Sequence, residues 1–155
     1  MSASKLLLLP LPHEGDLVYI LGFAEALEQA QALGYAEADP AFDIEGVDAA
    51  HKITLLAANA FGMPVRFADA QVEGITALQG MDVACAEQLG YRIKLLGVAQ
   101  KTESGIEQRV HPTMVPQDSV IAQVDGVTNA VAIESDVLGE LLMVGPGAGG
   151  NATAS

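Results

Sequence analysis

A stretch of the chain at residues 34–52 combines several acidic side chains with a single lysine. From about Gly46 onward apolar residues recur at helical spacing, so Asp48 and Lys52, four positions apart, share one face of an expected helix. A lysine beside carboxylates could carry a proton to or from a polar substrate. The alternative is a solvent-exposed ion pair, which stabilises a helix by roughly a few tenths of a kcal/mol. The five carboxylates of the stretch belong to Glu37, Asp39, Asp43, Glu45 and Asp48.

The elements that must position these residues are helices early in the chain and strands late in it. Helices are expected at 23–33, from near Gly46 to 61, and at 81–89, each followed by a glycine suited to end it. Apolar runs bounded by Gly, Pro, Asp or Asn predict the strands. This order predicts an α+β fold with helices packed on one face of a mixed, largely antiparallel sheet. The expected strands are 5–11, 17–21, 91–99, 105–115, 127–134 and 140–144.

Composition narrows the class of protein. The 155 residues suit a single domain, and 20 acidic against 7 basic residues give a net charge of −13, which argues against nucleic acid or an anionic membrane as partner. The apolar run at 5–12 is too short for a signal peptide or a membrane span, so we expect a cytoplasmic protein. The single Cys85 excludes an internal disulfide and is expected in the core, and the three histidines lack zinc-site spacing, so no metal is expected.

Five blocks of sequence, in the same order, resemble the homoserine dehydrogenase family. They read GYAEADP and DIEGVDAAHK over residues 34–52, GYRIKLLG over 90–97, RVHPT over 109–113, GVTNAV over 126–131 and GPGAGG over 145–150. Before them, only residues 18–21 echo the family's Asn-Gly-Thr-x-Asn-Tyr-Ile-Leu stretch. We therefore separate an atypical N-terminal segment, residues 1–22, from a single catalytic-type domain, residues 23–155.

The resemblance implies a function and roles for particular residues. It implies the substrate-binding, catalytic and dimerisation domain of an NAD(P)-dependent enzyme that interconverts L-aspartate 4-semialdehyde and L-homoserine, on the route to threonine, methionine and isoleucine. Lys52 would be the general acid/base, with Asp48 orienting it, and Glu37 and Asp43 would bind the α-ammonium of the substrate. A homodimer is implied as well. We expect Glu45 to be a solvated surface residue.

The cofactor, NADP or NAD, would be bound mostly by a nucleotide-binding half that is not recognisable in this sequence. Gly147 and Gly149 lie in a glycine-rich loop that passes near the cofactor in the family, or they form only an exit loop. Without that half, the chain could also be a non-catalytic dimerisation module. A semialdehyde dehydrogenase would need a nucleophilic cysteine, and Cys85 in an apolar helix does not suit that role.

Three further polar residues in the late strands are weaker candidates for a functional role. Arg92 and Lys94 alternate along one expected strand and should lie at the surface. The alternation of residues 108–113 predicts a sheet with one wetter face, on which His111 is a sheet residue rather than a metal ligand.

Overall fold

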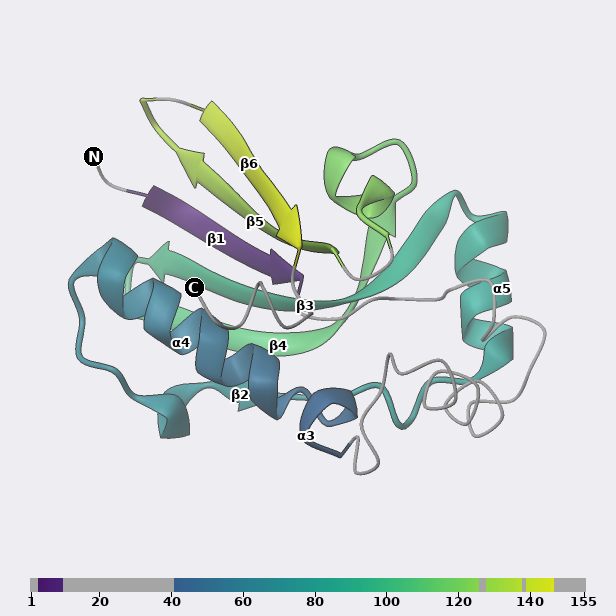
Figure 1. The fold of residues 1–155 in the computed structure, drawn as a ribbon, viewed down its shortest axis with the longest axis horizontal. Helices are drawn as coiled ribbons and strands as arrows, with labels where there is room; N and C mark the ends of the chain where they lie inside the picture. The colour runs from purple at the N-terminus through teal and green to yellow at the C-terminus, as the bar shows by residue number, and fades with distance from the viewer. Residues whose placement is uncertain (1–2, 10–40, 126–127, 138, 147–155) are drawn as a thin grey trace.

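The computed structural model describes residues 3–9, 41–125, 128–137 and 139–146. Its centre is a six-stranded sheet in the order β2-β4-β3-β1-β5-β6 (Figure 1). Every neighbouring pair is antiparallel except β2 and β4, which are parallel. The strands are β1 (Ala3–Leu9), β2 (Gln71–Val72), β3 (Tyr91–Thr102), β4 (Gly105–Pro116), β5 (Thr128–Ser135) and β6 (Gly139–Pro146).

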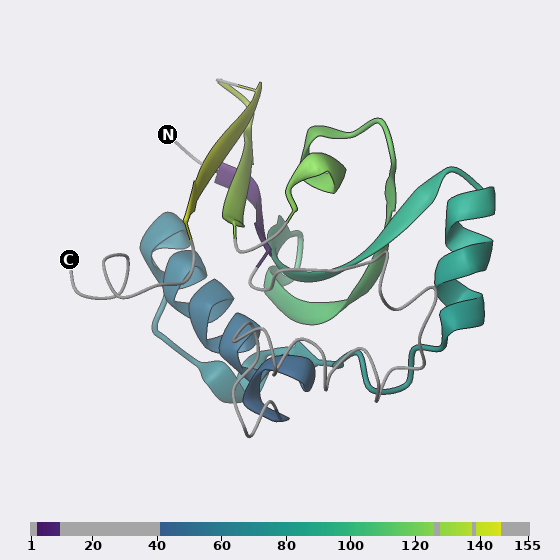
Figure 2. The same ribbon diagram turned by 45° about the vertical axis from the view of Figure 1, so that its right-hand side comes forward.

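Helix α4 (Val47–Phe61) lies across one face of the sheet (Figures 1 and 2). Its inner side carries Ala50, Ile53 and Ala57, all fully buried, which pack with Leu95 of β3 and Val110 of β4. The helix ends at Gly62, whose φ of 65° is the left-handed conformation that glycine adopts without strain. The helix and its glycine stop are therefore as the sequence predicts.

Two further helices and two 3-10 turns complete the described fold. Helix α5 (Gly80–Gln88) precedes β3 and packs against it, while α3 (Ala41–Ile44) leads into α4. Two 3-10 turns, η1 (Phe67–Asp69) and η2 (Val120–Gln123), follow α4 and β4. Among the described residues no helix is long and apolar enough to cross a membrane.

The opposite face of the sheet holds a second apolar cluster. Because side chains alternate along a strand, Leu96 and Val98 of β3 point away from α4 and pack with Ala130 and Ala132 of β5. Ile121 of η2 covers part of this cluster. The sheet is thus buried on both faces near its middle.

The α+β class and the largely antiparallel sheet are confirmed, as are the four late strands, within a few residues at each end. The sequence did not predict the short α3, β2, η1 and η2. The helix expected at 23–33 and the strand expected at 17–21 lie outside the described residues. The first strand begins two residues earlier than expected, at Ala3, and it lies in the interior of the sheet.

Candidate active site

Lys52 and Asp48 form an ion pair one turn apart on α4. The Lys52 Nζ lies 2.5 Å from the Asp48 Oδ2, and the two side chains are 42% and 25% exposed. The pair is carried by the part of the helix that faces away from the sheet, since Ala50 and Ile53 occupy the buried face. The amine is therefore held by a carboxylate yet open to solvent and to a small polar molecule.

Asp43 precedes this pair on α3, and the two helices are in contact. The chain turns between them at Gly46, which is buried, has a φ of 79°, and donates its N–H to the Asp43 carbonyl oxygen at 3.0 Å. Glu45 is exposed, as expected for a solvated side chain. The structure thus places Asp43, Asp48 and Lys52 on two consecutive, contacting helices.

The segment that follows η1 ties this helix junction to the sheet. We call residues 71–75 the tether. Its strand β2 pairs with β4, and beyond it the Glu73 N–H donates to the Val110 carbonyl and the Ile75 N–H to the Ile44 carbonyl, both at 2.8 Å. The tether therefore joins the last residue of α3 to the edge of the sheet.

His51, the residue before Lys52, lies between two aromatic rings, and its sequence position did not predict either contact. Its ring meets Phe42 of α3 edge-on, with centroids 5.6 Å apart, and Phe67 of η1 edge-on at 4.3 Å. Such contacts add roughly 0.5–1.5 kcal/mol beyond the area that they bury. This cluster is a second connection between α3, α4 and η1.

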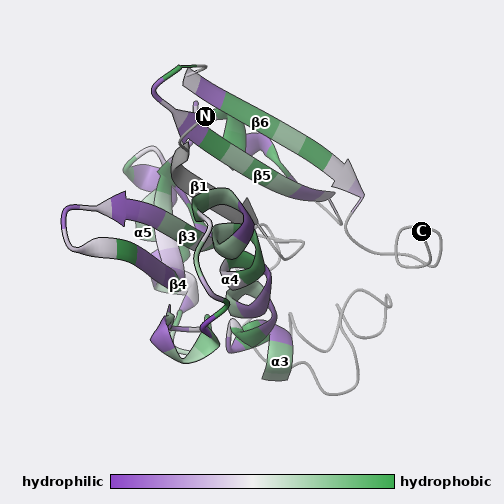
Figure 3. Cartoon of the chain, turned by 90° about the vertical axis from the view of Figure 1, so that its left-hand side faces the viewer, coloured by the Kyte–Doolittle hydropathy of each residue, from purple (hydrophilic) through white to green (hydrophobic). Residues whose placement is uncertain are grey.

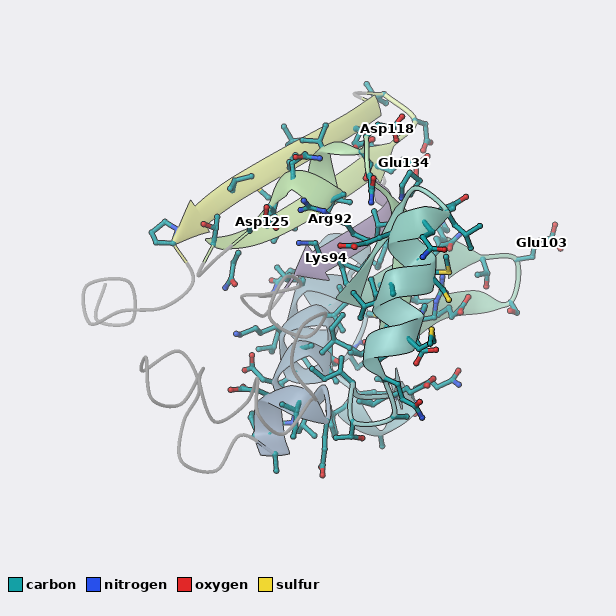
Figure 4. The ribbon with its side chains drawn as sticks, turned by 90° about the vertical axis from the view of Figure 1, so that its right-hand side faces the viewer. Arg92, Lys94, Glu103, Asp118, Asp125 and Glu134 are labelled. Carbon is teal, nitrogen blue, oxygen red and sulfur yellow. The ribbon has the colours of Figure 1, made fainter. Side chains whose placement is uncertain are left out.

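Lys94 contradicts the expectation of a surface position. Its side chain is only 4% exposed, and its Nζ donates to the Val124 carbonyl at 2.8 Å and to the Asp125 Oδ1 at 3.1 Å (Figure 4). The half-buried Arg92 donates from NH1 to both oxygens of the same carboxylate at 3.1 Å and to the Ala122 carbonyl at 3.0 Å. The two cations therefore fasten the segment after η2 to β3, on the face of the sheet opposite α4 and away from Lys52.

Burial of Asp125 acts to raise the pKa of its carboxyl, but the hydrogen bonds and charges of Lys94 and Arg92 outweigh that effect and lower the pKa below 3.8. The carboxylate is thus held ionised as the shared partner of two cations.

Two other polar residues are placed by the structure. His111 is half-buried on β4, accepts a hydrogen bond at Nε2 from the Arg109 Nε at 3.0 Å, and belongs to a polar row, as the alternation predicted. Cys85 is exposed, which corrects the expectation of a core thiol, because α5 buries only Val83 and Ala86. In the described part of the chain no three His, Cys, Asp or Glu side chains gather as a metal site.

Glu37, Gly147 and Gly149 lie outside the described residues. Gly145, Gly147 and Gly150 do have the spacing of a dinucleotide-binding loop. However, β6, which precedes the loop, is an antiparallel edge strand, whereas that loop normally follows a parallel strand of a βαβ unit. The described residues therefore do not make a nucleotide site of their own.

Comparison with known proteins agrees with this arrangement. The profile of the family described as homoserine dehydrogenase matches residues 15–155. Over 133 residues the chain is 59% identical to the homoserine dehydrogenases of Neisseria gonorrhoeae and of Pseudomonas aeruginosa, covering 86% of this chain and 31% of each relative.

Solved structures give the same result. A homoserine dehydrogenase from Thiobacillus denitrificans superposes with a TM-score of 0.91 at 49% identity, over 98% of this chain and 36% of that one. A hyperthermophilic archaeal homoserine dehydrogenase in complex with NADPH superposes with a TM-score of 0.75 at 26% identity, over 99% of this chain and 44% of that one. The chain spans about a third of the length of the curated relatives that it matches, and it belongs to the homoserine dehydrogenase family.

Proposed function

We propose that this chain supplies the substrate-binding and catalytic part of an NAD(P)-dependent homoserine dehydrogenase. The reaction is the interconversion of L-aspartate 4-semialdehyde and L-homoserine, in the cytoplasmic synthesis of threonine, methionine and isoleucine. The observation that carries the proposal is the ion pair of Lys52 and Asp48, 2.5 Å apart and partly open to solvent, in a member of this family.

Lys52 is the proton carrier in this proposal. A bound nicotinamide cofactor supplies or accepts the hydride. The Lys52 ammonium gives a proton to the aldehyde oxygen as negative charge grows there, and the amine takes the proton back from the hydroxyl of homoserine in the reverse direction. Asp48, one turn away on the same face, keeps the Lys52 amine in a fixed orientation.

Asp43 and Glu37 bind the α-ammonium of the substrate in this proposal, since carboxylates suit a cationic group. A nucleotide-binding half that is not recognisable in this sequence holds most of the cofactor, and Gly147 and Gly149 add backbone contacts to it. The NADPH complex of the archaeal relative supports NADP as one cofactor. The choice between NADP and NAD belongs to residues of the nucleotide-binding half.

We also propose that the protein is a homodimer. Strand β6, the last strand of the described sheet, is largely apolar in Figure 3. It carries Leu141, Met143 and Val144, which are 47%, 48% and 55% exposed. Exposed apolar residues on the edge strand of a sheet are suited to association with another chain. A purely structural dimerisation module is the competing function, and turnover separates the two.

The test of the proton carrier is Lys52→Ala in the full natural polypeptide that contains this sequence, assayed with L-homoserine and NADP or NAD. The expected result is a fall in kcat of roughly 100-fold or more. The free energy of unfolding should change by less than about 1 kcal/mol, because the side chain is 42% exposed and leaves no core cavity. Asp48→Asn should lower kcat less, since the amine remains.

Lys101→Ala is the matched control, because Lys101 is an exposed lysine at the far end of β3. Near-parental kcat in Lys52→Ala would show that the ion pair is only a solvated helix pair. Absence of turnover in the unsubstituted polypeptide would favour the dimerisation module.

A further inference from the structure

The α3–α4 junction carries three of the proposed active-site residues, yet it contains little that could fix its own shape. Helix α3 has only 4 residues, too few to be stable by itself. The position of Asp43 relative to Lys52 must therefore be set by contacts with the rest of the fold. The tether supplies most of those contacts, beside the ring contact between Phe42 of α3 and His51 of α4.

Gly74, in the tether, lies directly against the backbone of the junction. A Cβ atom added at Gly74 would be 2.3 Å from the Ile44 carbonyl oxygen and 2.5 Å from the Glu45 Cα. Backbone atoms have no rotamers through which to yield, so the two segments would have to separate. The φ of Gly74 is not in the positive range, so close approach alone explains glycine at this position.

The two neighbouring hydrogen bonds hold the tether in register. The Ile75 N–H reaches the Ile44 carbonyl and the Glu73 N–H reaches the Val110 carbonyl, each at 2.8 Å, so Gly74 sits between one bond to α3 and one to the sheet. Val110 also lies 3.0 Å from where a Cβ of Gly46 would be. The end of α3, the turn at Gly46 and the sheet edge thus meet at one buried point.

Helix α4 is held by β3 as well as by the tether. Val72 and Ile75 of the tether pack against the buried side of α4, but a Cβ at Gly97 would lie 3.0 Å from the Ile53 Cβ, so the middle of α4 also rests directly on β3. Displacement of the tether at Gly74 should therefore move Asp43 further than Lys52.

We propose that Gly74 is a positioning residue that sets the distance between the amine-binding carboxylate of Asp43 and the proton carrier Lys52. The inference rests on the proposed function. Since misplacement by about 1 Å can cost roughly 100-fold in rate, a displaced α3 should weaken the hold on homoserine without removing the acid/base.

The test is Gly74→Ala in the full natural polypeptide, with Gly105→Ala as the control. Gly105 begins β4 after the turn from β3 and has no atom within 4 Å of an added Cβ, while its φ of 139° disfavours alanine, so this variant reports general destabilisation. Gly74→Ala should raise the KM for L-homoserine about 10-fold or more, change kcat by less than about 3-fold, and leave the KM for the cofactor unchanged. Gly105→Ala should alter none of these.

A double-mutant cycle of Gly74→Ala with Asp43→Asn separates an effect on the position of Asp43 from general destabilisation. If Gly74 acts through Asp43, then Gly74→Ala should add less than about 2-fold to the KM in the Asp43→Asn background. An unchanged KM in Gly74→Ala, or a full 10-fold effect that persists without the Asp43 carboxylate, would overturn the proposal.

A second variant, Val72→Ala, tests the proposal if Gly74→Ala does not fold. It loosens the tether and should raise the KM for L-homoserine in the same way, and an unchanged KM in Val72→Ala would overturn the proposal. Unsubstituted polypeptide that fails to oxidise homoserine would instead contradict the proposed function.

Discussion

Lys52 and Lys94 place the same ammonium group in opposite surroundings. Lys52 is 42% exposed and has one carboxylate partner, whereas Lys94 is 4% exposed and is held by a carbonyl and a shared carboxylate. An exposed amine can reach a substrate and exchange protons, while a buried amine held by a carbonyl and a carboxylate ties two segments together. Proximity of charge alone therefore does not distinguish a chemical lysine from a structural one.

Because Lys94 is buried and Asp125 is its counter-charge, substitution of Asp125 should destabilise the fold more than substitution of Lys94. Lys94→Met keeps the length of the side chain and removes a buried charge, so the free energy of unfolding should change by less than about 1 kcal/mol. Asp125→Asn leaves the buried ammonium without its counter-charge and should cost about 1–2 kcal/mol, even though Asp125 is the more exposed partner at 55%. Urea denaturation at pH 7 of both variants measures this, and a larger loss in Lys94→Met would contradict it.

The cost of Asp125→Asn should depend on pH. The pKa of the Asp125 carboxyl is lower in the folded state, so its contribution is present above the unfolded value of 3.8 and is lost as the pH falls through the folded value. The stability difference between the parent and Asp125→Asn should therefore shrink below about pH 4.

Part of the site was predictable at this scale. The i, i+4 spacing of Asp48 and Lys52 fixes their common helix face, and the resemblance supplied their proposed roles. The burial of Lys94 was not predictable, because strand alternation tells which residues share a face but not which loop covers that face. The partner of Lys94 lies 31 positions further along the chain.

At the scale of elements, the contact between α4 and β3 depends on a glycine, Gly97, which has no side chain to separate the helix from the strand. Gly97 is buried, and a Cβ there would lie 3.0 Å from the Ile53 Cβ and 3.5 Å from two further atoms of Ile53. The helix can therefore rest directly on the strand at this point, as the fully buried Ile53 shows.

Gly97→Ala should push α4 away from the sheet and lower the free energy of unfolding by about 1–3 kcal/mol. Gly145→Ala makes the same chemical change in a strand with open space around it, and should stay within about 0.5 kcal/mol. Thermal melting of both variants decides this. Equal melting temperatures for the two variants would show that a methyl group fits between α4 and β3 without moving the helix.

Long elements with glycine stops were predictable, and short ones were not. Helix α4 has 15 residues and a clear apolar face, so its period is readable from the sequence. By contrast α3 has 4 residues and β2 only 2, which is about one period each and too short for a repeat to be read, and both exist through contacts with other segments. These two short elements are the ones that fix the junction near Asp43.

At the scale of the whole molecule, the sheet that the described residues form ends at β6, with apolar side chains exposed. We expect the protein to associate in a concentration-dependent way, measurable by sedimentation. Met143→Lys should weaken the association, because a lysine on an edge strand opposes pairing with another edge. Met81→Lys, at a methionine that is 71% exposed on α5, is the matched control and should leave the association unchanged.

A clean monomer across a wide range of concentration would contradict the proposed dimer. Equal weakening by both lysines would show that net charge, rather than the β6 edge, controls association. The sequence predicted the late strands, and the family resemblance implied a homodimer. Neither predicts the order of strands in the sheet, since strand order is decided by contacts between residues that lie far apart in the chain.

The interior position of β1 has a consequence for folding during synthesis on the ribosome. Leu8 of this first strand pairs with Gly97 on one side and Val131 on the other, so its neighbours are made about 90 and 120 residues after it. At typical rates of translation this is a wait on the order of ten seconds. Until β3 has left the exit tunnel the leucine-rich strand has no sheet to join, and its second edge stays unpaired until β5 has followed. The nascent chain must therefore hold β1 without a partner while more than half of the described sequence is translated.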